Sequence, residues 1–130
     1  MKKYITYAMT TLIVTIALAL AASDKARRTV ELTSVDKSGI TGTAWLEAQP
    51  RNQTHVELSI NQGDKAPMYE AAIHFGVCED IGGVAFKLAA LRNGRSHTMI
   101  PLNYASIDRP YAVTLSNGAN VVACGTFDKQ

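Results

Sequence analysis

Apolar and polar residues alternate along most of the chain after residue 28, with almost no apolar repeat at helical spacing. Clusters of turn-forming residues such as "NQGDKAP" and "EDIGG" interrupt this alternation. Short alternating runs, separated by turns roughly every eight to twelve positions, are typical of an all-β sandwich or barrel. The pattern predicts about eight strands, at residues 28–35, 40–48, 54–60, 68–75, 84–91, 96–102, 111–116 and 119–127.

Two Asn-Gly pairs indicate where consecutive strands should pair. Asn93-Gly94 follows the fifth predicted strand, and Asn117-Gly118 follows the seventh. An Asn-Gly loop tolerates the positive φ angles of a type I′ turn, whose twist matches that of a β-hairpin. The fifth and sixth strands, and likewise the seventh and eighth, are therefore expected to be antiparallel neighbours.

Alternation also assigns the faces of the fourth predicted strand, because successive side chains on a strand point to opposite sides. The more apolar side has to supply the core. The inward set is Tyr69, Ala71, Ile73 and Phe75, and the outward set is Glu70, Ala72 and His74. His74 is therefore expected on the outer surface of the sheet.

Residues 1–23 have the layout of a secretory signal peptide. Lys2 and Lys3 precede an apolar run from about Tyr4 to Leu20, and small residues follow it. Cleavage would leave residues 24–130 as one mature domain, periplasmic or secreted, with no membrane attachment. An uncleaved membrane anchor is the alternative, because the apolar run is close to the lower length limit for a span.

Charge argues against one class of partner. Lys2 and Lys3 are the charged residues of the first 23, so the predicted mature region has eleven basic and eleven acidic residues and a net charge of zero. Nucleic-acid binding draws much of its affinity from phosphate contacts, which a neutral chain without a basic run supplies poorly. A nucleic acid is therefore not an expected partner.

Cys78 and Cys124 are the two cysteines of the chain. In an exported protein an even number of cysteines predicts disulfide pairing, so one bond between them is expected. This bond would close a loop of about 47 residues, for which the chain-entropy model gives roughly 4 kcal/mol of stabilisation.

Catalytic motifs are absent from the sequence. It contains no nucleophile elbow, phosphate-binding glycine loop, paired-histidine metal motif or Cys-x-x-Cys. The three histidines, His55, His74 and His97, lie on three different predicted strands and have no ligand spacing along the chain. Strands can bring distant residues together, so a metal site built from them stays open.

The order of several short motifs resembles that of the copper/zinc superoxide dismutase family. "AIHFGVC" (72–78) resembles the His-x-His strand of that family with its following glycine and cysteine. "ACGTF" (123–127) resembles its C-terminal Ala-Cys-Gly strand, and "SGITGTAWLEAQ" (38–49) is similar to its second strand. The resemblance covers most of residues 28–127 and implies an eight-stranded Greek-key barrel with Cys78 and Cys124 as the disulfide pair.

The chain departs from this family at the positions that would bind metal. His74 matches the second histidine of His-x-His, but Ala72 stands where the first copper-binding histidine belongs. The region that would supply zinc ligands is shortened to "EDIGG", and "TLSNGANVV" holds neither the late histidine nor the late arginine. Redox cycling of superoxide needs a copper ion held by several imidazoles. The resemblance therefore implies a degenerate, non-catalytic member of the superfamily.

Together these observations predict an exported, non-catalytic protein that serves as a binding or structural module of the periplasm or cell exterior. The sequence names neither its ligand nor a protein partner, and on this interpretation no cofactor is expected. The alternative is a periplasmic metal-binding protein, with copper as the metal and His74 as a ligand beside His55 or His97.

Overall fold

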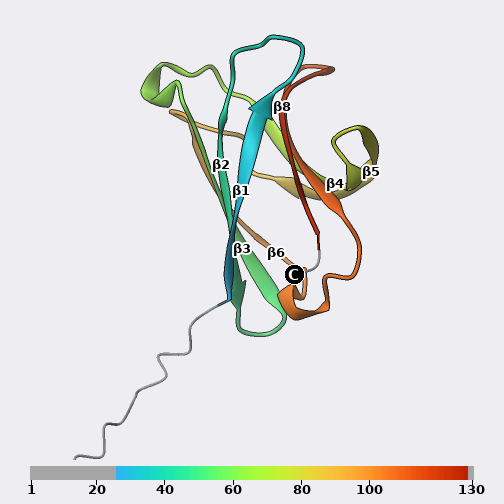
Figure 1. The fold of residues 1–130 in the computed structure, drawn as a ribbon. Coiled ribbons are helices and arrows are strands. Elements are labelled where there is room, and N and C mark those ends of the chain that lie inside the picture. Colours follow the sequence, from blue (N-terminus) through green and yellow to red (C-terminus); the bar gives the residue numbers. More distant parts are fainter. Residues whose placement is uncertain (1–25, 129–130) are drawn as a thin grey trace, which may run out of the picture.

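The protein folds almost entirely into β-strands, as the alternation predicts. The computed structural model describes residues 26–128, so the predicted signal peptide lies outside the described residues. The strands are β1 (Arg27–Ser34), β2 (Gly42–Gln49), β3 (Gln53–Ile60), β4 (Glu70–Val77), β5 (Asp80–Leu88), β6 (Arg95–Ile100), β7 (Tyr111–Asn117) and β8 (Asn120–Phe127). Two short 3₁₀ turns, η1 (Gly63–Lys65) and η2 (Tyr104–Ser106), lie in the connections (Figure 1).

All eight strands belong to one hydrogen-bonded sheet, in the order β5-β4-β7-β8-β1-β2-β3-β6. Every pairing is antiparallel, which confirms the predicted fold class. The neighbours β3 and β6, and likewise β4 and β7, are not consecutive in the chain, as expected of Greek-key crossovers. The hydrogen bonds describe one curled sheet, and the expected sandwich of two separate sheets is not confirmed (Figure 1).

The two edges of the curled sheet meet at a few hydrogen bonds just beyond the end of β5. The hydroxyl of Ser96, on β6, donates to the carbonyl oxygen of Ala89 at 2.6 Å. The backbone N–H of Ala89 donates to the hydroxyl of Thr98, also on β6, at 2.8 Å. These bonds between side chain and backbone hold the edges together where no strand pairing joins them.

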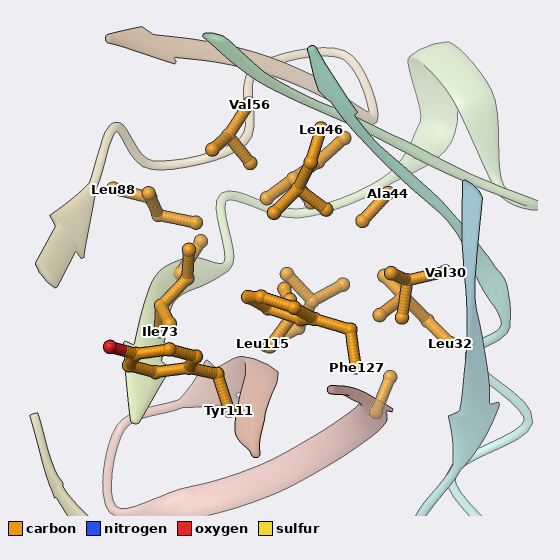
Figure 2. Close-up of a cluster of buried hydrophobic side chains, with 14 of the residues drawn as sticks. Val30, Leu32, Ala44, Leu46, Val56, Ile73, Leu88, Tyr111, Leu115 and Phe127 are labelled. Atoms are coloured by element: carbon orange, nitrogen blue, oxygen red, sulfur yellow. The ribbon is translucent and has the colours of Figure 1, made fainter. Parts of the chain in front are cut away.

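The hydrophobic core fills the inside of the curl (Figure 2). Leu46 of β2 and Leu58 of β3 come from one side, and Ile73 of β4 and Leu115 of β7 come from the other. All four side chains are fully buried. Strand β3 alternates strictly between buried and half-buried residues after its first position, which leaves His55, Glu57 and Ser59 on the outer face.

Phe75 is the exception to the predicted faces of β4. The three preceding members of the inward set are buried as expected, whereas Phe75 is 43% exposed. The pairing of β4 with β5 shifts register on both sides of His74. A β-bulge of this kind re-aims the side chains that follow it. Phe75 therefore leaves the core, and its ring lies against that of Tyr111 with 5.7 Å between the centroids.

Strand β5 begins earlier than predicted. It starts at Asp80, so most of "EDIGG", expected to be a loop, is strand. Cys78 and Glu79 form the turn of the β4–β5 hairpin. A Cβ atom on Gly82 would lie 2.8 Å from the carbonyl oxygen of Phe75. Glycine here permits a close approach of the two strands rather than ending one of them.

The two Asn-Gly pairs have different outcomes. Strands β7 and β8 form the predicted hairpin, although its two turn residues are Gly118 and Ala119. Asn93 and Gly94 both have positive φ, and the residues on either side of them pair, so a local turn forms there too. The predicted pairing of the fifth and sixth strands is nevertheless wrong, because β5 pairs with β4 and β6 pairs with β3. This turn lies on the crossover from one sheet edge to the other.

Candidate functional site

A hollow of about 390 Å³ lies on the outer face of β4, β5 and β7. Ala72 of β4 lies between Lys87 of β5 and Thr114 of β7 in the strand register. Because the alanine side chain is small, the surface at Ala72 is lower than the longer side chains around it, and this leaves the hollow. His74 and Val84 line one end of the hollow.

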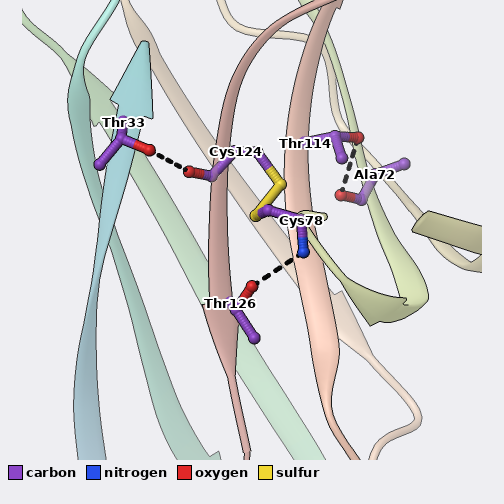
Figure 3. The surroundings of a disulfide bond; sticks show 6 residues. All are labelled: Thr33, Ala72, Cys78, Thr114, Cys124 and Thr126. Carbon is purple, nitrogen blue, oxygen red and sulfur yellow. Dashed lines mark hydrogen bonds between the residues drawn. A yellow bond between two sulfur atoms is a disulfide. The ribbon is translucent and has the colours of Figure 1, made fainter. Parts of the chain in front are cut away.

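The Cys78–Cys124 disulfide is formed as predicted, on the same face as the hollow (Figure 3). Cys124 pairs with Thr114, which in turn pairs with Ala72, so all three lie in one register row. Cys78 comes from the turn of the β4–β5 hairpin, and its backbone N–H donates to the hydroxyl of Thr126 at 3.0 Å. The bond therefore fastens this hairpin to β8, next to the hollow.

His74 is half-buried and oriented by β5. Its Nδ1 lies 3.0 Å from the carbonyl oxygen of Gly82. A carbonyl only accepts, so Nδ1 carries the hydrogen and Nε2 keeps a free lone pair in the neutral ring. The register neighbours of His74 are Val84 and Ala112, and neither can bind a metal.

The remaining polar groups lie around the hollow rather than at one point. Glu70 pairs with Ser116 across β4 and β7, which places a carboxylate and a hydroxyl at the end away from His74. Lys87 contributes an exposed ammonium group opposite Ala72. The hollow thus combines a largely apolar base with an acidic, a basic and a hydroxyl group, which suits binding of a small polar molecule.

His55 and His97 lie together on a different part of the sheet. They belong to the neighbouring strands β3 and β6, and their rings stack with 5.6 Å between centroids. The sheet neighbours of β4 are β5 and β7, so His74 shares no register row with either ring. Between residues 26 and 128, no group of three or more His, Cys, Asp or Glu side chains is placed to hold a metal ion. In the strand order, β7, β8, β1 and β2 separate β4 from β3, so strand pairing does not place His74 beside His55 or His97.

Sequence reasoning identified His74 and Ala72 but missed Lys87, Val84 and Ser116 as lining residues. A weak signal exists, because Lys87 and Ser116 are polar residues within the fifth and seventh predicted strands. What brings them to His74 is the pairing of β4 with both β5 and β7. The second of these pairings joins strands that are far apart in the sequence, so no local sequence pattern predicts it.

Comparison of the chain with protein-family models, curated proteins and solved structures finds no match. In the part of the chain that the structure describes, no helix has the length and apolar character needed to span a membrane. What bears on function is therefore the chemistry of the residues around the hollow.

Proposed function

We propose that this chain is an exported, non-catalytic β protein that binds a small organic ligand in the hollow on β4, β5 and β7. The observation that carries the proposal is the hollow itself, with about 390 Å³ of space and a few polar groups around an apolar base. Ligand sites are usually concave, mostly apolar and roughly 300–1,000 Å³ in volume. Its size suits a small molecule rather than a polymer.

The charges around the hollow favour a ligand with both an acidic and a basic group. Lys87 complements an anionic group, and Glu70 complements a cationic group about one row away on the neighbouring strand. Val84, which is 54% exposed, offers an apolar surface at the other end. A small zwitterion with an apolar body, such as a free amino acid, would complement all three of these side chains.

The distances around the hollow support binding without catalysis. Ser116 pairs with Glu70, four residues along β4 from His74. At about 3.3 Å per residue, the hydroxyl and the imidazole are roughly 13 Å apart along the strand. A nucleophile and its general base need to be within hydrogen-bond reach. These two groups therefore do not form a catalytic pair.

Export is supported by the disulfide together with the N-terminal pattern. Disulfides persist in oxidising compartments and are rare in the cytosol. The superoxide-dismutase-like ancestry belongs to the proposal as well: it rests on the sequence motifs around Cys78 and Cys124, and Ala72, in the place of a copper-binding histidine, is the reason to propose a non-catalytic member.

The test of ligand binding uses a variant that fills the hollow. Ala72→Phe should abolish binding, and Thr29→Phe, which places the same ring at an exposed position on β1, should leave it unchanged. Amide NMR spectra recorded with a panel of free amino acids would show shifts at Ala72, Val84 and Ser116. The proposed site would be refuted if the amino acids shifted the amide signals of Ala72→Phe as much as those of Thr29→Phe. It would also be refuted if the shifts occurred only on strands other than β4, β5 and β7.

Copper binding through His74 is a second candidate function. The observation that favours it is the hydrogen bond from Nδ1 to the Gly82 carbonyl oxygen, because metal-binding histidines usually donate their other N–H to a carbonyl or carboxylate. One equivalent of copper retained by the parent protein and lost from His74→Ala would establish it. Equal copper retention by both proteins would exclude it.

A further inference from the structure

Two imidazoles and a thioether lie side by side on the outer face of β3 and β6. We call His55, His97 and Met99 the His–Met patch. In the antiparallel register His55 lies directly opposite Met99, and His97 lies opposite Glu57. Opposite residues in such a pair have Cβ atoms about 4.5–5.5 Å apart. All three side chains of the patch are therefore within reach of one small ion.

The two rings are stacked, so they have to rotate before their nitrogens can bind one ion, because a metal lies in the plane of each imidazole that binds it. Their planes differ by 14°, and their centroids are 5.6 Å apart. His97 is exposed and His55 is half-buried, so both can rotate without disturbing the core. Within the described chain neither ring makes a hydrogen bond, in contrast to His74, so their nitrogens are open to a ligand.

Met99 is the unusual member of the patch. Its side chain is 49% exposed, although methionine is an apolar residue that usually fills irregular gaps in cores. On β6 it follows the outward positions of Arg95 and His97, and the residues between them point inward or are half-buried. The strand geometry thus holds the sulfur on the same face as both imidazoles.

We propose that the His–Met patch is a copper site that binds Cu(I) through two imidazole nitrogens and the Met99 sulfur. Imidazole suits zinc and copper alike, whereas a thioether is a soft ligand that selects Cu(I). A structural zinc site takes four ligands from cysteine, histidine or carboxylate. In residues 26–128, no three cysteine, histidine or carboxylate side chains are placed together to hold a metal, so the patch lacks the ligands of a structural zinc site. The Met99 sulfur therefore favours Cu(I) over zinc.

Glu57 adds to the attraction for a cation. It lies opposite His97 on β3 and is half-buried on the same outer face. A carboxylate one strand away lowers the energy of a bound positive ion without having to ligate it. The site differs from the hollow in its strands, its residues and its ligand, so it does not rest on the proposed ligand binding.

The protein carries a reporter for this site. Trp45 is the single tryptophan of the chain, and it lies on the outer face of β2 in the same register row as Glu57 and His97. Strands are about 4.8 Å apart, so Trp45 is roughly 10 Å from His97. Copper at the His–Met patch should therefore quench tryptophan fluorescence.

The experiment titrates the disulfide-intact protein with Cu(I) under anaerobic conditions with ascorbate. A coloured Cu(I) chelator competes for the metal and gives the affinity, while Trp45 fluorescence reports the position. We expect one equivalent of bound Cu(I). Loss of even an outer partner of a metal ligand weakens binding by about 10-fold or more, so His55→Ala and His97→Ala should each weaken it by at least about tenfold.

Matched variants separate ligation from packing. Met99→Leu keeps the size of the side chain and removes the sulfur, so it should weaken Cu(I) binding and leave Zn(II) binding as in the parent. Met68→Leu removes an exposed thioether that lies outside the patch, and it should change neither the affinity nor the quenching. His97→Gln serves in place of His97→Ala if that variant does not give the thermal melt of the parent.

Two results would overturn the proposal. One is a parent protein that does not compete with the chelator or that loses no affinity in the His55 and His97 variants. The other is copper binding that survives these variants and disappears in His74→Ala, which would place the metal at β4 instead.

Discussion

Truncation of Ile73 tests the assignment of faces on β4. Its side chain is fully buried among the core residues (Figure 2). Ile73→Ala removes three carbon atoms, and at about 0.8 kcal/mol per buried CH₂ the lost transfer energy is about 2.4 kcal/mol. The cavity left behind adds to this, so the free energy of unfolding should fall by about 2–5 kcal/mol.

The neighbouring residue supplies the matched control. His74 lies next to Ile73 on the same strand but on the outer face, where its imidazole hydrogen-bonds to the Gly82 carbonyl oxygen. The sequence alone predicts a change within about ±0.5 kcal/mol for an exposed substitution. With this hydrogen bond lost, His74→Ala should cost about 1 kcal/mol or less.

Urea denaturation of both variants with the disulfide intact measures the two effects. The dependence of the unfolding free energy on urea should be the same in each, because the surface exposed on unfolding hardly changes. Ile73→Val should fall between the two, at about 0.5–1.5 kcal/mol. If His74→Ala is more damaging than Ile73→Ala, the face assignment is wrong and the histidine has a buried partner.

Two further predictions concern the disulfide and the close packing of β1 against β8. Because Cys78 and Cys124 are 46 positions apart, Cys78→Ser should lower the free energy of unfolding by about 2–5 kcal/mol, measured by urea denaturation. The parent should show no free thiol and run as a monomer without reductant; a covalent dimer would contradict this. A Cβ on Gly125 would lie 2.4 Å from the Glu31 carbonyl oxygen, so Gly125→Ala should cost about 1–3 kcal/mol. Gly83→Ala, where a Cβ meets nothing, should stay within about 0.5 kcal/mol, and equal melting shifts would contradict this packing.

Local patterns in the sequence predicted the strands well. The alternation located all eight, with ends displaced by a few residues, because burial of one face repeats every second position. The disulfide followed from the cysteine count. The β7–β8 hairpin followed from a glycine that can adopt positive φ between them.

Features that depend on non-local contacts could not be predicted. Asn93-Gly94 has the local chemistry of a hairpin turn, but tertiary packing sends the next strand to the opposite sheet edge. The exposure of Phe75 follows from a bulge that only the pairing of β4 with β5 creates. The stack of His55 on His97 likewise requires β3 beside β6, which no local pattern records.

The central claim is that the chain is an exported domain with one disulfide bond. Intact mass spectrometry of the exported fraction under non-reducing conditions tests this claim most directly. The account predicts a chain that begins at Ala22 or Asp24 and is lighter than its reduced form by two hydrogen atoms. A membrane-bound species that retains Met1 and carries two free thiols would contradict it.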